Sequence, residues 1–214
     1  MSDSSEIMST SLSLIVLFED DFTKGRPICL PDVSIEGLKT RPIRTPGSRF
    51  AFMNIPWGQH LLKVISDIYF SESLKVAPSS EKDRPMYPPI KINLRPRPSY
   101  AFPPGATLIR GILRKRGRPI VGALIKGKAQ AGDFSIATDR GGDFVIYFRD
   151  IEEKDVVIIE GKACLKGPKT ESLDPSEIPI EIEFYEGDNK VKVAGRSFQG
   201  NILGRSNSRI IDLP

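Results

Sequence analysis

The tetrapeptide Gly-Arg-Pro-Ile occurs twice in this sequence, as Gly25-Arg26-Pro27-Ile28 and as Gly117-Arg118-Pro119-Ile120. Each copy follows one apolar run and precedes another. Glycine permits positive φ angles, and proline fixes φ and removes a backbone donor, so the tetrapeptide is typical of a turn between strands. The repeat therefore predicts two copies of the same β unit in one chain.

The apolar runs around these turns are short, as strands require. Residues 12–18 form such a run before the first copy, and residues 107–113 form one before the second. A hairpin is predicted near the C-terminus, where Gly187-Asp188-Asn189 joins two strand-like segments, Ile178–Tyr185 and Lys190–Val193. With 18 Gly and 18 Pro among 214 residues, and no helical periodicity over ten or more residues, the chain is expected to be all-β.

The linear organisation predicts two modules with short flanking segments. The expected parts are an N-terminal arm (1–10), a first β-sandwich (11–94), a Pro-rich linker (95–105), a second β-sandwich (106–193) and a C-terminal tail (194–214). The linker has four prolines and no run that would pack in a core, so it is expected to be extended and semi-rigid.

Bulk properties exclude several classes of protein. The net charge of +4 is too small to indicate nucleic-acid binding by itself. The first ten residues lack the basic and apolar regions of a secretory signal, and no apolar run is long enough to span a membrane. Cys29 and Cys164 fall in different modules, which argues against a disulfide framework and is compatible with the cytoplasm, or with a particle assembled there.

A second turn motif makes the pattern specific enough to compare with a family. Thr138-Asp139-Arg140-Gly141-Gly142-Asp143-Phe144 follows the second Gly-Arg-Pro-Ile, and the series resembles the carboxypeptidase regulatory-like, or prealbumin-like, family. Residues 50–64 are similar to that family's closing hairpin, with His60 where an aromatic usually stands. The resemblance implies two tandem Greek-key β-sandwiches of immunoglobulin-like or prealbumin-like type, without catalytic residues. The tandem organisation is also similar to accessory proteins of contractile, phage-tail-like injection particles.

The sequence offers little material for catalysis or metal binding. His60 is the sole histidine, it lies within a predicted strand, and no Gly-x-Ser-x-Gly motif is present. One histidine and two isolated cysteines do not make a typical zinc site. We therefore expect a protein that is not an enzyme and has no catalytic residues, cofactor or metal site. A calcium site remains an open alternative, because hard cations bind clustered carboxylate oxygens. If no calcium binds, these carboxylates are solvated turn residues. The acids concerned are Glu19, Asp20, Asp21, Asp139, Asp143 and Asp150.

Basic and aromatic residues gather near the linker. Arg110 to Arg118 contains a basic run without an intervening acid, and Tyr100 and Phe102 lie just before it. Such a mixture is able to bind single-stranded nucleic acid by phosphate neutralisation and stacking. The alternative, which we favour, is that these cations face solvent along an edge strand and discourage edge-to-edge aggregation.

Partner-binding candidates are Trp57, Tyr100, Phe102, Ile210, Ile211 and Leu213. Trp57 sits on a turn, where it either stacks on a sugar or partner protein or, the favoured interpretation, folds onto the end of its own sandwich. The apolar tail is expected to add a strand to a neighbouring sheet. The leading hypothesis is a non-enzymatic structural or adaptor protein that contacts other protein subunits, as a homo- or hetero-oligomer. The alternative is a carbohydrate- or small-ligand-binding module.

Overall fold

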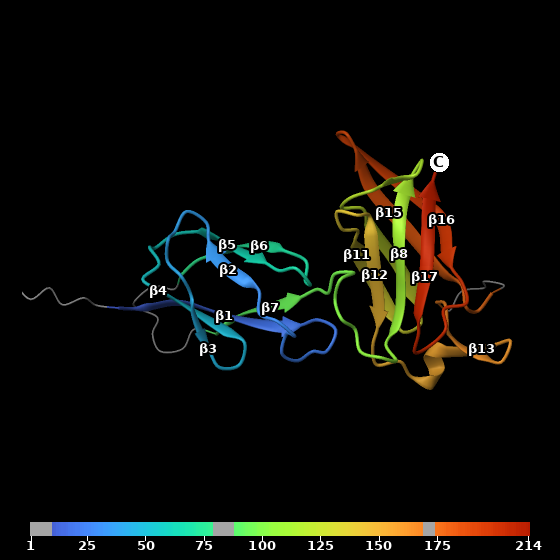
Figure 1. Ribbon diagram of the computed structural model, residues 1–214, viewed down its shortest axis with the longest axis horizontal. Coiled ribbons are helices and arrows are strands. Elements are labelled where there is room, and N and C mark those ends of the chain that lie inside the picture. The colour runs from blue at the N-terminus through green and yellow to red at the C-terminus, as the bar shows by residue number, and fades with distance from the viewer. Residues whose placement is uncertain (1–9, 79–87, 169–173) are drawn as a thin grey trace, which may run out of the picture. The chain divides into compact units, whose positions relative to one another are not determined.

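The structure is a computed structural model that describes residues 10–78, 88–168 and 174–214. Within these ranges the regular structure is β-strand apart from one 3₁₀ turn, η2 (Glu153–Asp155), so the predicted all-β class is confirmed. The chain divides into two compact units, Met1–Pro96 and Arg97–Pro214, called unit 1 and unit 2 below (Figure 1).

Unit 1 contains two sheets, with strand orders β3-β4-β1-β7 and β2-β5-β6. Alternate residues of the central strands are buried, because successive side chains of a strand point to opposite faces. Phe18 and Phe50 pack edge to face with ring centroids 5.5 Å apart, and Leu62 of the other sheet is fully buried. The strands are β1 (Leu12–Asp20), β2 (Asp32–Ile35), β3 (Ile43–Thr45), β4 (Arg49–Met53), β5 (His60–Ile65), β6 (Glu72–Val76) and β7 (Ile90–Leu94).

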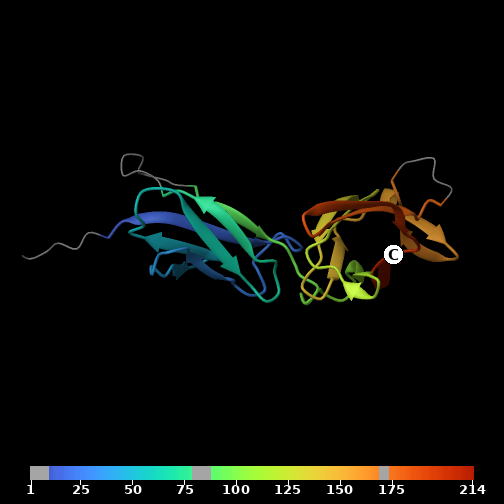
Figure 2. The same ribbon diagram turned by 90° about the horizontal axis from the view of Figure 1, so that it is seen from above.

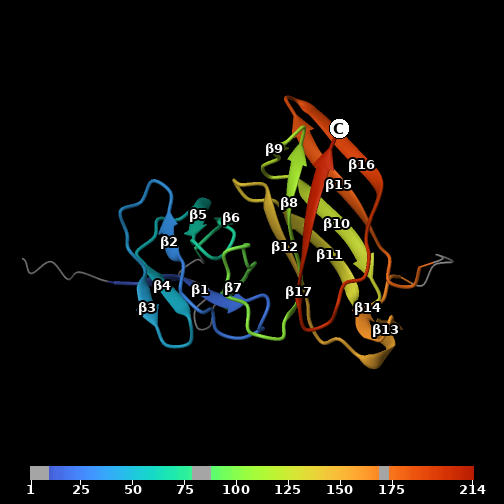
Figure 3. The same cartoon turned by 45° about the vertical axis from the view of Figure 1, so that its right-hand side comes forward.

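Unit 2 contains the sheets β11-β10-β15-β16 and β12-β8-β17, with the short β9 paired to β8. The two sheets face each other as layers (Figure 2), and their apolar faces form the core. A separate hairpin, β13-β14, lies at one end (Figure 3). The strands are β8 (Thr107–Lys115), β9 (Arg118–Pro119), β10 (Leu124–Ala129), β11 (Gly132–Ala137), β12 (Asp143–Phe148), β13 (Val156–Ile159), β14 (Lys162–Leu165), β15 (Ile178–Glu186), β16 (Asn189–Phe198) and β17 (Ser206–Leu213).

The two units share a connectivity that explains the sequence repeat. In unit 1, β1 pairs antiparallel with β4 and parallel with β7. In unit 2, β8 pairs antiparallel with β12 and parallel with β17. The pairs β2-β5 and β5-β6 likewise correspond to β10-β15 and β15-β16, all antiparallel. Each Gly-Arg-Pro-Ile follows the first strand of its unit, so the tetrapeptide marks the same position in both.

The third strand is the main topological difference. In unit 1, β3 pairs with β4, whereas in unit 2 the corresponding β11 pairs with β10 in the opposite sheet. Unit 2 also inserts η2 and the β13-β14 hairpin between β12 and β15. The sheet β11-β10-β15-β16 is therefore four-stranded, while its counterpart β2-β5-β6 is three-stranded.

Candidate interaction surfaces

The two turn motifs of unit 2 contact each other. The Thr138 hydroxyl donates to the Ile120 carbonyl at 2.6 Å and accepts from the Ala123 N–H at 2.9 Å. The Thr138 backbone N–H also donates to the Ala123 carbonyl, and the Gly122 N–H donates to the Thr138 carbonyl. Thr138 is 3% exposed, so its hydroxyl is satisfied within the fold. The motifs that carry the family resemblance thus build a turn rather than a binding site.

The acidic residues beside Thr138 close that turn. The Asp139 carboxylate accepts from the N–H groups of Gly141, at 2.8 Å, and Asp143, at 3.0 Å. Gly142 has a φ of 75°, and a Cβ on it would lie 2.7 Å from a β8 carbonyl oxygen, so glycine is required there. Burial raises the pKa of the Asp143 carboxyl, the charge of Asp139 raises it further, and Arg114 opposes both.

Asp20, the last residue of β1, is a buried acid of unit 1. Its carboxylate is fully buried and accepts from the N–H groups of Phe22 and Thr23 and, at 2.6 Å, from the hydroxyl of Tyr69. The Tyr69 oxygen in turn accepts from the Ile28 N–H at 3.1 Å. A buried carboxylate with several donors is a structural anchor. Asp20 therefore fixes the loop that carries the first Gly-Arg-Pro-Ile.

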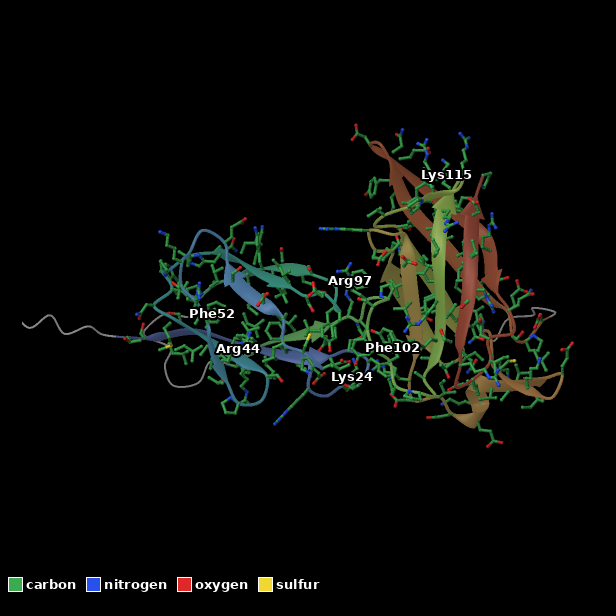
Figure 4. The ribbon with its side chains drawn as sticks, in the orientation of Figure 1. Lys24, Arg44, Phe52, Arg97, Phe102 and Lys115 are labelled. Carbon is green, nitrogen blue, oxygen red and sulfur yellow. The ribbon has the colours of Figure 1, made fainter. Side chains whose placement is uncertain are left out.

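Of the other acidic candidates, Asp150 is exposed after β12, and two form ion pairs. Glu19 pairs with Lys91 at 2.8 Å, and Asp21 pairs with Lys24 at 2.6 Å (Lys24 is labelled in Figure 4). Across residues 10–78, 88–168 and 174–214, no three His, Cys, Asp or Glu side chains are grouped as a metal site. Cys29 is exposed, Cys164 is buried, and neither forms a disulfide. Within the same ranges, no helix has the length and apolar character needed to cross a membrane.

Trp57 is the most exposed aromatic candidate of unit 1. Its side chain is 73% exposed, so the interpretation that the ring folds onto its own sandwich is wrong. The other large apolar side chains exposed in the described part of unit 1 are aliphatic: Leu12, Ile28, Ile43 and Ile65. Trp57 thus stands without a second exposed aromatic ring among the described residues of this unit.

The turn that presents Trp57 is held in place on both sides. Before it, the Asn54 N–H donates to the Ser11 carbonyl at 2.9 Å and the Asn54 side chain accepts from the Ser11 N–H at 2.8 Å. After it, His60 Nε2 lies 2.8 Å from the Pro56 carbonyl oxygen. Asn54 also adopts a φ of 53°, which asparagine tolerates better than most residues. The ring is therefore presented by an ordered turn, and His60 has a structural role there.

The predicted linker is packed against unit 2 from Pro98 onward. Tyr100 is 2% exposed, in contrast to the expectation that this stretch packs in no core. The Arg110 guanidinium donates to the carbonyls of Pro98, at 2.7 Å, and Tyr100, at 3.5 Å. It also lies 5.2 Å from the centroid of Phe102, which Figure 4 labels. We call the segment 98–103 the strap, because Arg110 binds it along its length.

The strap also explains the basic and aromatic cluster. Phe102 packs against Tyr100, with centroids 4.6 Å apart, and against Tyr147 of β12, at 5.7 Å. Arg110 lies on β8, which is the central strand of its sheet, so the expectation of an edge strand is wrong at this residue. Burial lowers the pKa of the Arg110 guanidinium, as expected for a cation partly withdrawn from water. The aromatic rings and this cation therefore contact one another within the fold.

The predicted C-terminal tail forms a strand of unit 2. β17 pairs with β8 in parallel over its whole length, so the tail adds a strand to its own sheet. Ile211 and Leu213 are 7% and 3% exposed and belong to the core, whereas Ile210 is 73% exposed. The Asn207 side chain adds hydrogen bonds to the carbonyls of Leu108 and Ile202.

Arginines occupy the outer edge of β17. Arg209 donates to the carbonyls of Ser208 and Gln199, and Arg196 of β16 donates to the Asp212 carbonyl at 3.5 Å. The Ser208 and Asp212 carbonyls belong to β17, and an added strand would need carbonyls of this kind. Strand addition at the tail is therefore opposed by the protein's own side chains.

A groove crosses the solvent face of the sheet β11-β10-β15-β16. Its volume is about 660 Å³. A β-bulge opens β16 opposite Glu181, and Gly195 within it has a φ of 77°. The lining residues are Lys126, Gly127, Lys128, Asp133, Phe134, Ser135, Pro179, Ile180, Glu181, Ala194 and Gly195. Residues with short or no side chains, such as Gly127 and Ala194, form part of the lining. Two lysines and two acidic residues also line it.

None of the residues that line the groove was among the functional candidates predicted from the sequence. The alternation of Lys126 and Lys128 with core residues identifies a solvent-facing strand side, and Gly195 is a signal for a bulge. Neither signal says which strands lie side by side. The groove needs β11 beside β10 and β16 beside β15, and only the second of these pairings was predicted, as a hairpin.

No protein family model matches this sequence, and no curated protein matches it. Among solved structures, the chain aligns with the Bacillus anthracis TIE protein at 11% identity and a TM-score of 0.28, covering 94% of this chain and 33% of that one. It aligns with a streptococcal ancillary pilin at 8% identity and a TM-score of 0.26, covering 81% of this chain and 49% of that one. The chain thus spans a third of the first structure and half of the second, and similarity at these scores carries no functional inference.

Proposed function

We propose that this chain is a non-enzymatic structural or adaptor protein, built of two carboxypeptidase regulatory-like sandwiches, that contacts other protein subunits. The observation that carries the proposal is Trp57, whose side chain is 73% exposed on a turn held by hydrogen bonds on both sides. Rigid, exposed aromatic residues are the most frequent anchors of protein interfaces, because they bury much area at little cost in conformational entropy.

The roles of the polar candidates support a non-enzymatic function. His60, Asp139 and Asp20 each bind backbone groups or a neighbouring side chain and thereby fix a turn or loop. A catalytic acid or nucleophile needs a hydrogen-bonding side available to substrate in a cleft. These three residues instead use their hydrogen bonds to hold turns and a loop in place.

The narrower form of the proposal concerns the assembly. Following the organisation of the sequence, we place the chain in a contractile, phage-tail-like injection particle that assembles in the cytoplasm. The measurement that tests this is the mass of the native complex recovered from cells, with its co-purifying chains identified. A chain recovered without partner subunits would contradict the proposal.

Trp57→Ala tests the anchor itself. The matched control is Ile65→Ala, since Ile65 is also in unit 1 and is 55% exposed. We expect the first variant to lose at least tenfold in partner recovery, as for an interface hot spot, and the control to retain it. Both variants should keep the wild-type unfolding midpoint, because both side chains are exposed. Equal recovery of partners by the two variants would contradict the assignment of Trp57.

The alternative of a carbohydrate-binding module receives less support from the same turn. Sugar recognition by stacking commonly uses aromatic platforms, and Trp57 has no second exposed aromatic in the described residues of unit 1. A glycan array with the wild-type chain and Trp57→Ala tests the alternative. A glycan that binds the wild-type chain but not Trp57→Ala would favour the carbohydrate-binding function over a protein-binding role of Trp57.

A further inference from the structure

The groove and Trp57 have complementary chemistry although they lie on different units. The groove lining combines small groups with two cations, and Ser135 lies opposite Lys126 on the neighbouring strand. A cation positioned over an indole face is attracted by the ring quadrupole. The chain already pairs cations with rings in this way, since the Lys115 ammonium lies 5.6 Å from the Phe184 centroid (Figure 4 labels Lys115).

The charges around the groove favour a neutral guest. Asp133 pairs with Lys128 at 3.6 Å, Glu181 pairs with Lys192 at 2.7 Å, and Lys126 pairs with Glu183 at 3.1 Å. Each charged side chain of the lining therefore has a partner of opposite charge. The turn that carries Trp57, residues 54–59, has no charged side chain. Bringing the two surfaces together therefore places no unpaired charge against a like charge, which would cost several kcal/mol in an interface.

Size also fits. The groove volume of about 660 Å³ lies within the range of about 300–1,000 Å³ that is usual for sites binding small organic groups. An indole with the adjoining Pro56 ring is a guest of that class. Because the Trp57 side chain is 73% exposed, covering it would remove apolar surface from water, which is favourable.

We propose that Trp57 of one copy of this chain docks in the groove of a second copy, lined by Lys126, Lys128 and Ser135, and that the copies thereby associate head to tail. The inference rests on the proposed function, since it names the partner of the same turn. The two surfaces differ, so the contact is heterologous: in a docked pair, one copy keeps a free groove and the other keeps a free anchor. Such contacts generate open chains or closed rings, which suits a structural component of a larger assembly.

Two variants of the full-length chain isolate the two halves of the contact. Trp57→Ala removes the anchor, and Ser135→Tyr fills the groove with a residue that strands accept well. The control is Ser208→Tyr, the same substitution at an exposed position of β17 in the other sheet. Hydrogen exchange of β10 and β15 shows whether the Ser135→Tyr sheet remains intact.

The assay is sedimentation over a range of protein concentrations. The wild-type chain and Ser208→Tyr should increase in average mass with concentration, whereas Trp57→Ala and Ser135→Tyr should each stay monomeric. An equimolar mixture of these two monomeric variants should form complexes of about twice the monomer mass and no larger, because one intact anchor meets one intact groove.

Three results would overturn the inference. The first is a wild-type chain that stays monomeric up to its solubility limit, and the second is a mixture of the two variants that does not associate. The third is a different subunit from cells that is retained by the wild-type chain and lost by Ser135→Tyr, which would assign the groove to that subunit. In the first two cases, partner recovery in the Trp57→Ala experiment still decides the proposed function separately.

Discussion

Ile210 and Ile211 form a matched pair that tests whether the last strand belongs to the core of unit 2. They are adjacent on β17 and face opposite sides, so Ile210 is 73% exposed and Ile211 is 7% exposed. Ile211→Ala leaves a cavity in the core and should lower the free energy of unfolding by about 2–4 kcal/mol. Ile210→Ala removes a side chain from solvent and should change it by less than about 0.5 kcal/mol.

The loss of unfolding free energy expected for Ile211→Ala is large for a domain of this size. Stabilities of single domains are about 5–15 kcal/mol, so the buried substitution removes a substantial fraction, and a loss of that size lowers a melting temperature by roughly 10 °C. Hydrogen exchange measured by mass spectrometry under mild denaturant assigns the loss to a unit. Peptides from β8 and β17 should lose protection in Ile211→Ala, while peptides from β1 and β4 should match the wild type.

Truncation after Arg205 extends the same test. It removes two buried apolar side chains, Ile211 and Leu213, and the hydrogen bonds of Asn207. Their combined contribution approaches the whole stability of a domain, so unit 2 should unfold. Equal unfolding midpoints for the two single variants, or β8 amides as protected after truncation as before, would refute the reasoning.

Three further outcomes are expected in the full-length chain. Arg110→Gln should destabilise unit 2 by about 1–2 kcal/mol through loss of the strap hydrogen bonds, and the exposed Arg118→Gln by less than about 0.5 kcal/mol; equal urea midpoints would contradict the role of Arg110 in holding the strap. Gly142→Ala should lower the melting temperature more than Gly161→Ala, because both have positive φ but only the first would place a Cβ against backbone; equal losses would contradict this. Hydrogen bonds from two lysines hold the pKa of Glu183 at about 2, so its contribution to stability is present above the unfolded-state value of 4.5 and is lost as pH falls toward 2. Glu183→Gln should weaken the pH dependence of unfolding in that window, and an unchanged acid-unfolding curve would contradict it.

The fold class was predictable because local signals agree with it. Glycine and proline mark the turns, and Thr138 through Phe144 marks the start of β12, since each residue type meets a backbone requirement there. The hairpin of β15 and β16 was predicted from alternation and its Gly-Asp-Asn turn, and the structure has it. These features depend on residues close together in sequence, which a single sequence displays directly.

The errors concern contacts that composition does not display. Tyr100 lies within the Pro-rich stretch and Arg110 follows it, and composition alone does not show that Arg110 binds the backbone around Tyr100. Ile211 and Leu213 form an apolar end, but their burial depends on β8, almost one hundred residues earlier. Trp57 was assigned to its own sandwich on the usual behaviour of large rings, whereas its turn directs it into solvent. Among the partner-binding candidates, Trp57 and Ile210 are the exposed ones.

The difference between the two units explains why unit 2 has the groove. In unit 1 the third strand, β3, joins β4, so the sheet β2-β5-β6 has no additional strand beside β2. In unit 2 the equivalent β11 joins β10 and supplies Asp133, Phe134 and Ser135, which form one side of the groove. Moving one strand between sheets thus widens a face that the shared connectivity would leave narrow. The repeated turns follow the first strand in both units, and the strand that changes sheets gives unit 2 a four-stranded face where the described part of unit 1 has three strands.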